Sequence, residues 1–412
     1  MSESSTPAGR VTLADLEGDP HRVLAQLRTA APAAWVPVLG TWLVTGYDLA
    51  VAVLRDPRTF TVDDPRFSTA QVVGPSMLSL DGAPHAHHRG PFNRPFRHDE
   101  VHARLAAFTR AETGRLVSAI EPLGAAELRR AVAGPLAAAV MAEVLGLGQV
   151  DPATILTWYD GIVAAVQAEG AAAGRGALAD TGADTGADTG ADTGADEVTS
   201  VAAGGTAAFG ELAASLREVI ARGDSLLAEV TGPLAEQEAI SNAAVLMFGG
   251  IETTEGMITN ALLHVLSSPA QLALVLADPG LVPAAVEESL RLEPAAAVVD
   301  RYATVGTRLG GTAIQAGDQV TVSITGANRD PAVFADPDVF DVRRANAARH
   351  LAFAHGPHFC LGAHLARLEA QVAVGTLLAR LPRLRLDPGY PSAPRGLVFR
   401  KPPALRVRWD TG

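Results

Sequence analysis

The most informative stretch of this sequence is Phe353-Ala-His-Gly-Pro-His-Phe-Cys-Leu-Gly362. An amphipathic helix is predicted directly after it, because apolar side chains recur at helical spacing until Pro382. Cys360 is therefore expected at a helix N-terminus, where the helix dipole and free backbone N–H groups stabilise a thiolate. Gly356 and Gly362 remove side chains on either side of it, as is needed where a flat ligand or another backbone approaches closely.

Cys360 is the only cysteine of the chain. A disulfide within the chain is therefore impossible, which fits a reducing compartment, and zinc sites built from four cysteines are excluded. A lone cysteine is most often a small buried apolar side chain. Here the flanking glycines, together with His358, whose imidazole can reach an anion, favour a thiolate ligand instead.

The pattern Phe353-x-x-Gly356-x-His358-x-Cys360-x-Gly362 resembles the heme-binding signature of the cytochrome P450 family. The resemblance implies that Cys360 is the axial ligand of the iron in heme b, that His358 contacts a heme propionate and that Gly362 lies beside the cofactor. In this family the thiolate pushes electron density toward the iron and favours cleavage of the O–O bond. Ala354 occupies the position of the family's second glycine, a departure that we expect to cost little.

A long helix is predicted over residues 235–266, with Phe248-Gly-Gly-Ile-Glu-Thr-Thr-Glu255 in its middle. Two glycines inside a helix cost about 1 kcal/mol each relative to alanine, which a planar cofactor packed against the helix would explain. Glu252 and Thr253 place a carboxylate beside a hydroxyl, a pair suited to relaying protons. The alternative is a threonine that bonds a carbonyl four residues earlier, with Glu252 in solvent.

The same segment resembles the family's oxygen-activation motif, Gly-x-(Asp/Glu)-Thr-Thr. The resemblance implies that Gly249 packs against the heme and that Glu252 and Thr253 are the catalytic acid–alcohol pair that delivers protons to dioxygen. Ile251 replaces a histidine that is common in bacterial members, which leaves the pair intact. Because family enzymes that run on peroxide often lack the pair, its presence favours monooxygenation that depends on dioxygen.

Other separated motifs also match the family. Glu288-Ser-Leu-Arg291 places opposite charges on one helix face, and such a pair usually lies at the surface. The family's Glu-x-x-Arg motif instead implies a buried structural ion pair, whose third partner is Arg343 or Arg344. His85-x-x-x-Arg89 and Arg301 resemble the groups that hold the heme propionates. The histidines at 85, 87 and 88 could alternatively form a dedicated metal site, but no other metal-ligating residues cluster near them in the sequence.

The composition predicts a large, mainly helical protein. Hydrophobic residues make up 48% of the chain and charged residues 19%, which suffices for a large core. Helices are expected over residues 12–29, 48–55, 99–147 and 153–169, and strands around 35–44, 299–323, 396–400 and 405–407. The Ala-Asp-Thr-Gly repeat of residues 179–196 is predicted to be a disordered acidic loop.

We therefore expect a mainly α fold with a minor β region. The resemblance implies a single cytochrome P450 domain over residues 1–412, a triangular helical prism with the heme between the long central helix and the cysteine-bearing helix. The implied activity is that of a heme-thiolate monooxygenase that hydroxylates an apolar or amphipathic small molecule of secondary metabolism. Its pocket is expected to be lined by Ala244, Phe248, Val298, Val299 and Val398.

Two alternatives to hydroxylation remain open. The same heme could serve coupling, ring formation or nitration, or the chain could be a non-catalytic heme protein that recruits other enzymes. For an oxygenase, the two electrons are expected from NAD(P)H through a ferredoxin reductase and a ferredoxin. Docking candidates are Arg94, Arg97, Arg349 and Arg367, although a merely solvated surface explains each of them equally well.

The charge and hydropathy of the chain bear on its partners and location. A net charge of −12 argues against nucleic acids and anionic membranes as main partners. No apolar run approaches the roughly 18 residues that cross a bilayer, and the N-terminus lacks the apolar core of a secretory signal. We therefore expect a cytoplasmic protein without membrane insertion.

Overall fold

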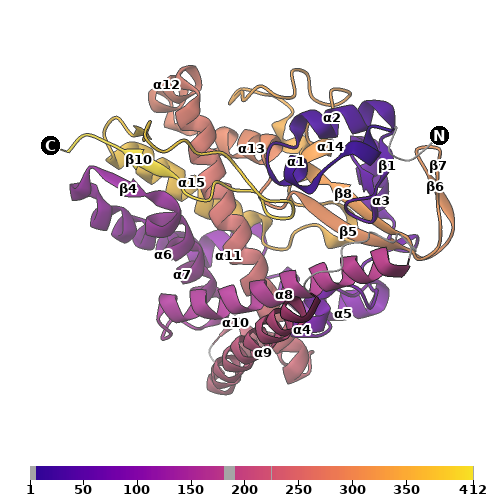
Figure 1. Ribbon diagram of the computed structural model, residues 1–412. Helices are drawn as coiled ribbons and strands as arrows, with labels where there is room; N and C mark the ends of the chain where they lie inside the picture. The colour runs from indigo at the N-terminus through magenta and orange to yellow at the C-terminus, as the bar shows by residue number, and fades with distance from the viewer. Residues whose placement is uncertain (1–5, 181–190, 224, 412) are drawn as a thin grey trace. The chain divides into compact units, whose positions relative to one another are not determined.

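We describe the protein from a computed structural model that covers residues 6–180, 191–223 and 225–411. Helices dominate and strands form small sheets (Figure 1), which confirms the predicted mainly α fold with a minor β region. The residues group into two compact units. The first unit comprises Met1–Phe60, Phe96–Val140 and Gly250–Gly412, and the second comprises Thr61–Pro95 and Met141–Gly249.

The largest sheet has five strands in the order β1-β2-β8-β5-β3. Its strands are β1 (Ala33–Val36), β2 (Thr41–Val44), β8 (Gln319–Ser323), β5 (Val298–Ala303) and β3 (Phe60–Thr61). β2 and β8 run parallel, with Trp42 opposite Val320, whereas β1 pairs with β2 and β5 pairs with β8 in antiparallel fashion. The strands expected around 35–44 and 299–323 are thus confirmed, including the hairpin of β6 (Thr307–Leu309) and β7 (Thr312–Ile314).

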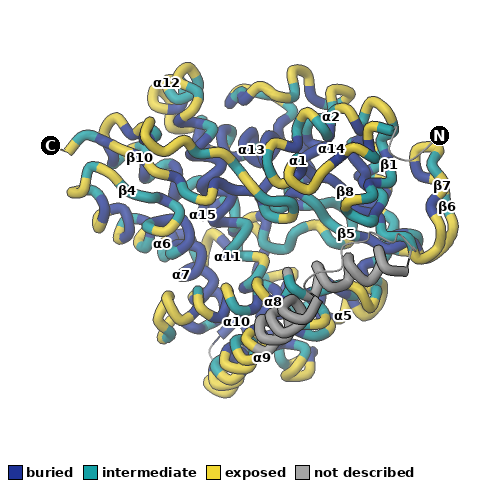
Figure 2. Tube along the Cα trace, in the orientation of Figure 1, coloured by how far each residue is buried: buried dark blue, intermediate teal, exposed yellow. Residues whose placement is uncertain are grey.

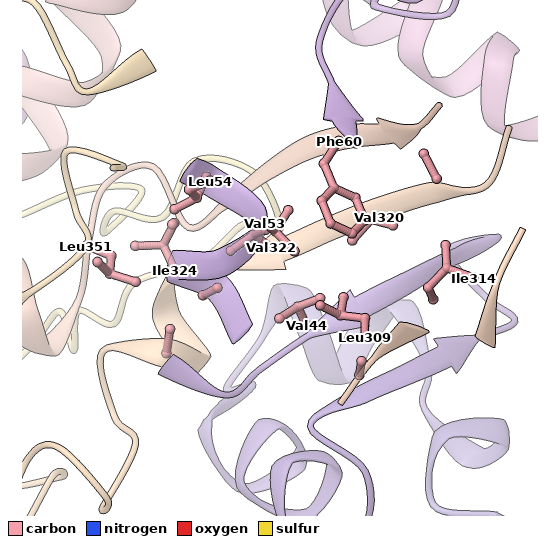
Figure 3. Packing of buried hydrophobic residues seen from close by; sticks show 14 residues of the cluster. Val44, Val53, Leu54, Phe60, Leu309, Ile314, Val320, Val322, Ile324 and Leu351 are labelled. Carbon is pink, nitrogen blue, oxygen red and sulfur yellow. The ribbon is translucent and has the colours of Figure 1, made fainter. Parts of the chain in front are cut away.

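The buried face of this sheet and helix α3 (Tyr47–Arg55) form a hydrophobic core within the first unit (Figure 3). Val320 and Val322, two residues apart on β8, point to the same face, as the period of a strand requires. Val53 of α3 packs against them, and Leu351 closes one end of the cluster; each of these side chains is at most 2% exposed. Because Leu351 lies only two residues before Phe353, this core fixes the beginning of the Cys360 loop.

The first unit also contains several helices. They are α1 (Leu13–Glu17), α2 (His21–Ala30), α3, α6 (His98–Ile120), α12 (Pro269–Ala277), α13 (Val282–Leu292), α14 (Ile324–Ala327) and α15 (Ala363–Arg380). α15 packs along α6 and buries Leu365, Leu368 and Leu377. Because Ala370 and Val374 are buried as well, burial extends around most of the helix, in contrast to the single apolar face that was predicted. Glu369 is buried with them, and burial raises its pKa well above the usual range. Figure 2 shows that α13 is largely buried, whereas α12 is exposed along much of its length.

Arg400 ties the N-terminal and C-terminal segments of the first unit together. Its Nε donates to Glu293 at 2.7 Å, and its terminal nitrogens donate to the carbonyls of Leu16 (3.2 Å) and Gly18 (3.0 Å). Burial alone would raise the pKa of Glu293, but the hydrogen bond from His21 and the charge of Arg400 outweigh it and lower the pKa to about 2. The carboxylate is therefore ionised at neutral pH and completes the clamp.

The second unit consists mainly of helices. These are α4 (Ser68–Val73), α5 (Gly82–Asn93), α8 (Pro152–Asp180), α9 (Ala191–Arg222) and α10 (Leu226–Val230). Two further helices, α7 (Gly134–Leu145) and α11 (Glu236–Ser267), begin in one unit and end in the other. α8 and α9 pack so closely that a Cβ on Gly205 would lie 2.2 Å from the Cβ of Ala165. Only glycine at 205 permits this contact.

Two helices predicted as continuous are interrupted. The helix expected over 99–147 ends at Ile120, because Pro122 and Gly124, with φ +70°, turn the chain into strand β4 (Ala125–Glu127). A π-helical turn then leads into α7. The helix expected over 12–29 is divided into α1 and α2 by Gly18 and Pro20. The long helix expected over 235–266 is confirmed as α11.

The C-terminal strands differ in part from the prediction. β10 (Arg406–Arg408) pairs with β4 on one side and with β9 (Arg385–Leu386) on the other, which confirms the strand expected near 405–407. The strand expected over 396–400 is wrong. This segment forms only isolated bridges, Ala296 with Phe399 and Arg395 with Lys401, because the donors of Arg400 gather the neighbouring carbonyls into a turn.

The Ala-Asp-Thr-Gly repeat of residues 179–196 lies partly outside the described residues, which omit 181–190. Residues 179 and 180 end α8, and residues 191–196 open α9. These flanks are thus helical, in contrast to the expected loop. Alanine in every repeat unit supplies enough helix propensity to extend helices that are anchored elsewhere along their length.

Helix length and composition bear on the question of membrane insertion. Within the described ranges, no single helix is both long enough and apolar enough to cross a bilayer. Helices α11 and α12, which meet at 105°, satisfy that test only when the two are taken together.

Candidate functional site

The Cys360 loop is held in shape by its own backbone and by α3. The N–H of Cys360 donates to the carbonyl of Phe353 at 2.8 Å, which closes the loop over a short 3-10 turn, Gly356–His358. Gly356 has φ +72°, and a Cβ there would lie 2.5 Å from the carbonyl oxygen of Leu54. Glycine is therefore required at 356 both for the turn and for the close approach of the end of α3.

Cys360 lies just outside the helix that follows it. α15 begins at Ala363, with Gly362 as its N-cap residue, so Cys360 precedes the first helical residue instead of forming part of it. The cysteine is half-buried, as is His358. A Cβ on Gly362 would meet no atom within 4 Å, so open space lies beside the loop. The thiol is thus presented at the edge of an open region in front of a helix N-terminus.

Ala354 adopts the left-handed backbone conformation that favours glycine, with φ +58°. A β-carbon in this region costs about 1 kcal/mol, so the departure from the family's glycine is not free of strain. We expect Ala354→Gly to raise the free energy of unfolding by about 0.5–1 kcal/mol, measured by chemical denaturation. Ala352→Gly, two residues earlier and without positive φ, is the matched control and should lower it. A loss of stability in Ala354→Gly would contradict the strain argument.

A group of ion pairs contacts the first residue of the loop, Phe353. Arg367 of α15 stacks over the Phe353 ring at 4.4 Å and donates to Glu287 of α13 at 2.5 Å. His350 lies 3.1 Å from the other carboxylate oxygen of Glu287. Burial would raise the pKa of Glu287, but the bonds from His350 and Arg367 outweigh it and lower the pKa to about 2. Arg367 is therefore engaged inside the first unit, whereas the docking candidates Arg94, Arg97 and Arg349 are exposed.

Glu288 and Arg291 of α13 form an ion pair with both side chains 0% exposed. Arg291 donates from Nε and Nη2 to the two carboxylate oxygens, each at 2.8 Å. Of the two candidates for a third partner, the structure selects Arg344, whose Nε lies 2.9 Å from Glu288 Oε1. Arg291 and Arg344 also donate to the carbonyl of Val339, at 3.1 and 3.0 Å. The group thus organises the chain that leads toward the Cys360 loop.

The part of α11 in the first unit carries the predicted acid and alcohol. The Glu252 side chain is only 14% exposed and pairs with the Nζ of Lys401 at 2.7 Å. This placement rules out the alternative in which Glu252 lies in solvent. Sequence reasoning did not find Lys401; the signal it offered is that Lys401 is the only lysine of the chain.

Other predicted residues of the first unit lie on or near β5. Arg301 is 5% exposed, and its NH1 donates to the carbonyl of Asp300 at 2.7 Å. Val298 and Val299 are half-buried, whereas Val398 is 46% exposed. A cavity of about 20 Å³ lies beside Val298, which is room for about one water molecule. That cavity is too small to hold an organic substrate.

The remaining predicted residues belong to the second unit. His85 of α5 is 7% exposed and Arg89 is half-buried. On α11, Ala244 is fully buried, Phe248 is half-buried and Gly249 is exposed. Within the second unit, α5 thus carries two of the residues predicted to bind propionates, and α11 carries two of the residues predicted to line the pocket.

The two histidines that follow His85 have protein partners. His88 Nδ1 lies 2.9 Å from the amide of Asn242, whose oxygen accepts from the backbone N–H of Met77. His87 lies 3.1 Å from Glu238. Burial lowers the pKa of His88. Both imidazoles therefore join α5 to the first half of α11.

Comparison with known proteins adds independent findings. A family model described as Cytochrome P450 matches residues 276–397. Over 97% of its length the chain is 35% identical to cytochrome P450 monooxygenase PikC of Streptomyces venezuelae, of which it covers 93%. It is 31% identical, again over 97% of its length, to the 6-deoxyerythronolide B hydroxylase of Saccharopolyspora erythraea, of which it covers 99%.

Solved structures agree with the sequence comparison. The crystal structure of P450BioI in complex with hexadec-9Z-enoic acid ligated acyl carrier protein matches with a TM-score of 0.81 and 27% identity. The match covers 96% of this chain and 99% of that one.

Proposed function

The chain belongs to the cytochrome P450 family of monooxygenases, and from that membership we propose that it hydroxylates an apolar or amphipathic small molecule of secondary metabolism. The observation that carries the proposal is the Cys360 loop, in which the only thiol of the chain lies half-buried at the edge of an open region. The relatives named above, cytochrome P450 monooxygenase PikC and 6-deoxyerythronolide B hydroxylase, support hydroxylation of a small molecule.

The residues at the site fit a heme. Cys360 offers a thiolate, the axial donor of this family, and no atom lies within 4 Å of a Cβ added at Gly362, beside the loop. Gly249, which the family motif assigns to the heme, is exposed within the second unit. When bound, heme with a thiolate ligand supplies the redox chemistry that cleaves dioxygen. We assign the propionates to His85, Arg89, Arg301 and His358, since cationic and N–H donors bind carboxylates strongly.

Glu252 and Thr253 then handle protons. A carboxyl group that has been protonated from solvent can donate to a hydroxyl, which accepts that proton as it donates its own onward. The two residues are adjacent on α11, and Glu252 is shielded from most solvent by its pair with Lys401. Glu252 therefore serves as the proton source and Thr253 Oγ1 as the final donor. Val298, Val299, Ala244 and Phe248 supply apolar surface that excludes water from the substrate.

Electrons come from separate proteins in this proposal. NAD(P)H would reduce a ferredoxin reductase and then a ferredoxin in the cytoplasm, and the ferredoxin would dock on basic side chains. Arg94, Arg97 and Arg349 remain candidates because they are exposed. Arg367 is the weakest candidate, because Glu287 already neutralises it.

Thr253→Ala tests the proton assignment. We expect it to raise the hydrogen peroxide released per NADPH consumed by about tenfold, since the hydroxyl no longer donates the proton that commits dioxygen to cleavage. A surrogate ferredoxin and reductase with 7-ethoxycoumarin as apolar probe suffice for this measurement. Thr259→Ala is the matched control, because that buried hydroxyl donates to the backbone carbonyls of Glu255 and Gly256 in the preceding turn of α11. Unchanged peroxide release in Thr253→Ala would remove Thr253 from the mechanism.

Product analysis with isotopically labelled dioxygen tests the reaction class. Hydroxylation places one labelled oxygen atom in the product. An oxidised product without label would favour coupling or ring formation on the same heme.

A further inference from the structure

Lys401 is the only lysine among the 33 basic residues of the chain, and it is buried at the predicted proton-delivery motif. Its Nζ lies 2.7 Å from Glu252 Oε1 and 2.6 Å from Glu255 Oε1. The three side chains are 10%, 14% and 11% exposed. Because an ammonium has three donors and no acceptor, Lys401 can hold both carboxylates at once.

The local sequence explains how a residue so far along the chain reaches α11. Positions 252, 256 and 260 are four apart and therefore share one helix face. Gly256 has no side chain, and a Cβ there would lie only 3.5 Å from the Cβ of Lys401, so the lysine stem lies across it. Asn260 donates to the carbonyl of Arg400 at 2.9 Å, which fixes the backbone directly before Lys401. The ammonium is thus delivered to Glu252 by a fixed backbone.

Glu255 is the second, anchored partner of the ammonium. Its Oε1 also accepts from Arg129 Nε, and Arg129 in turn donates to the carbonyl of Pro403 at 3.0 Å. Gly134 lies directly beside it, since a Cβ there would lie 2.7 Å from Glu255 Oε2. Arg129, Glu255 and Lys401 therefore form a fixed group. The carboxylate of Glu252 is attached to this group through Lys401.

We propose that Lys401 is a positioning residue for proton delivery, which holds the carboxylate of Glu252, the residue directly before Thr253 in the chain, in one place. The inference rests on the proposed function of that pair. When Glu252 takes up a proton, the ammonium of Lys401 still contacts an ionised carboxylate, because it shares Glu255 with Arg129. Glu252 can therefore gain and release a proton without rearrangement of its surroundings. No electron and no further reactant is involved in this step.

The contact can be tested directly because the chain has one lysine. Full-length, heme-loaded protein labelled with 13C at lysine Cε gives a single side-chain resonance. We expect Glu252→Gln and Glu255→Gln each to shift that resonance, whereas Glu236→Gln, which removes an exposed carboxylate paired with Arg217, should not. A resonance that is unchanged in Glu252→Gln would overturn the proposal, whatever the activity of the variant.

The effect on catalysis is tested by a double-mutant cycle. Lys401→Met keeps most of the stem over Gly256 but removes the charge, and we expect it to raise peroxide release per NADPH about tenfold, the equivalent of one lost hydrogen bond to a charged group. Lys401→Arg should recover most of the wild-type value, since it keeps a cation between the two carboxylates. In a Glu252→Gln background, Lys401→Met should have no further effect, because the lysine acts through Glu252.

The outcomes separate this inference from the proposed function. The assignment of Lys401 alone would be overturned if the effects of Lys401→Met and Glu252→Gln on peroxide release per NADPH multiplied in the double variant. Wild-type peroxide release in Lys401→Met would overturn it as well. If Thr253→Ala and Glu252→Gln both released as little peroxide per NADPH as the wild type, the proposed proton pathway itself would be wrong. The inference about Lys401 would then fail with it.

Discussion

Replacing Cys360 with serine is expected to abolish the long-wavelength Soret band of the reduced carbon monoxide complex and nearly all monooxygenase turnover. Serine has the same shape, so the loop closed by the bond from residue 360 to Phe353 should persist. The thiolate, however, is lost, and with it the electron push that favours O–O cleavage. We expect turnover to fall on the order of a thousandfold, or about 4 kcal/mol of transition-state stabilisation.

The variant has a clear control and a clear contradiction. Circular dichroism and thermal unfolding of heme-free Cys360→Ser should match those of the heme-free wild type, because the substitution changes no packing. If the Soret band of the reduced carbon monoxide complex has the same position in Cys360→Ser as in the wild type, the iron is held by another residue, because Cys360 is the only cysteine of the chain. The proposed function would then lose its basis.

Removing one partner of the Glu288–Arg291–Arg344 group should destabilise the protein severely. Glu288→Gln would leave two guanidinium groups without their carboxylate, one of them 0% exposed and the other 9%. Breaking a buried pair in this way costs about 3–5 kcal/mol, a large share of the stability of most proteins. We expect a correspondingly lower midpoint in urea, or protein that does not retain heme.

An exposed pair with the same spacing provides the matched control. Glu112 and Arg115 of α6 are also three residues apart, but the arginine is 63% exposed. Glu112→Gln should therefore change the free energy of unfolding by less than about 1 kcal/mol. A mild effect of Glu288→Gln, similar to that of Glu112→Gln, would show that the buried group does not hold the segment around Val339.

Local motifs predicted much of the site. Three features were predicted from short sequence patterns: the Cys360 loop, the long helix with Glu252 and Thr253, and the Glu288–Arg291 pair. In each of them the interacting residues lie close together in the sequence. Contacts at this range depend on helix geometry and on turn residues, which a sequence displays directly. The end of the helix at Ile120 was not predicted, because only Pro122 and Gly124 separate two long helical patterns of apolar residues.

Contacts between distant segments could not be predicted. Glu255 and Lys401 are 146 residues apart, and nothing in either local sequence names the other. The choice between Arg343 and Arg344 was likewise open, because adjacent side chains on an irregular segment point in directions that only the surrounding fold determines. Helical continuation into the repeat beyond residue 190 depends on where α9 is anchored, which composition alone does not reveal.

The clamp made by Arg400 has a consequence for the order in which this protein can be completed on the ribosome. The carbonyls of Leu16 and Gly18 are translated 384 and 382 residues before Arg400, their partner. β4 likewise is translated long before β10, with which it pairs. Until Arg400 and β10 have left the ribosome, the nascent polypeptide carries an unpaired strand edge, the kind of surface that chaperones shield and that promotes aggregation. Synthesis of the segment around residues 400–408 is thus the step that lets both contacts close.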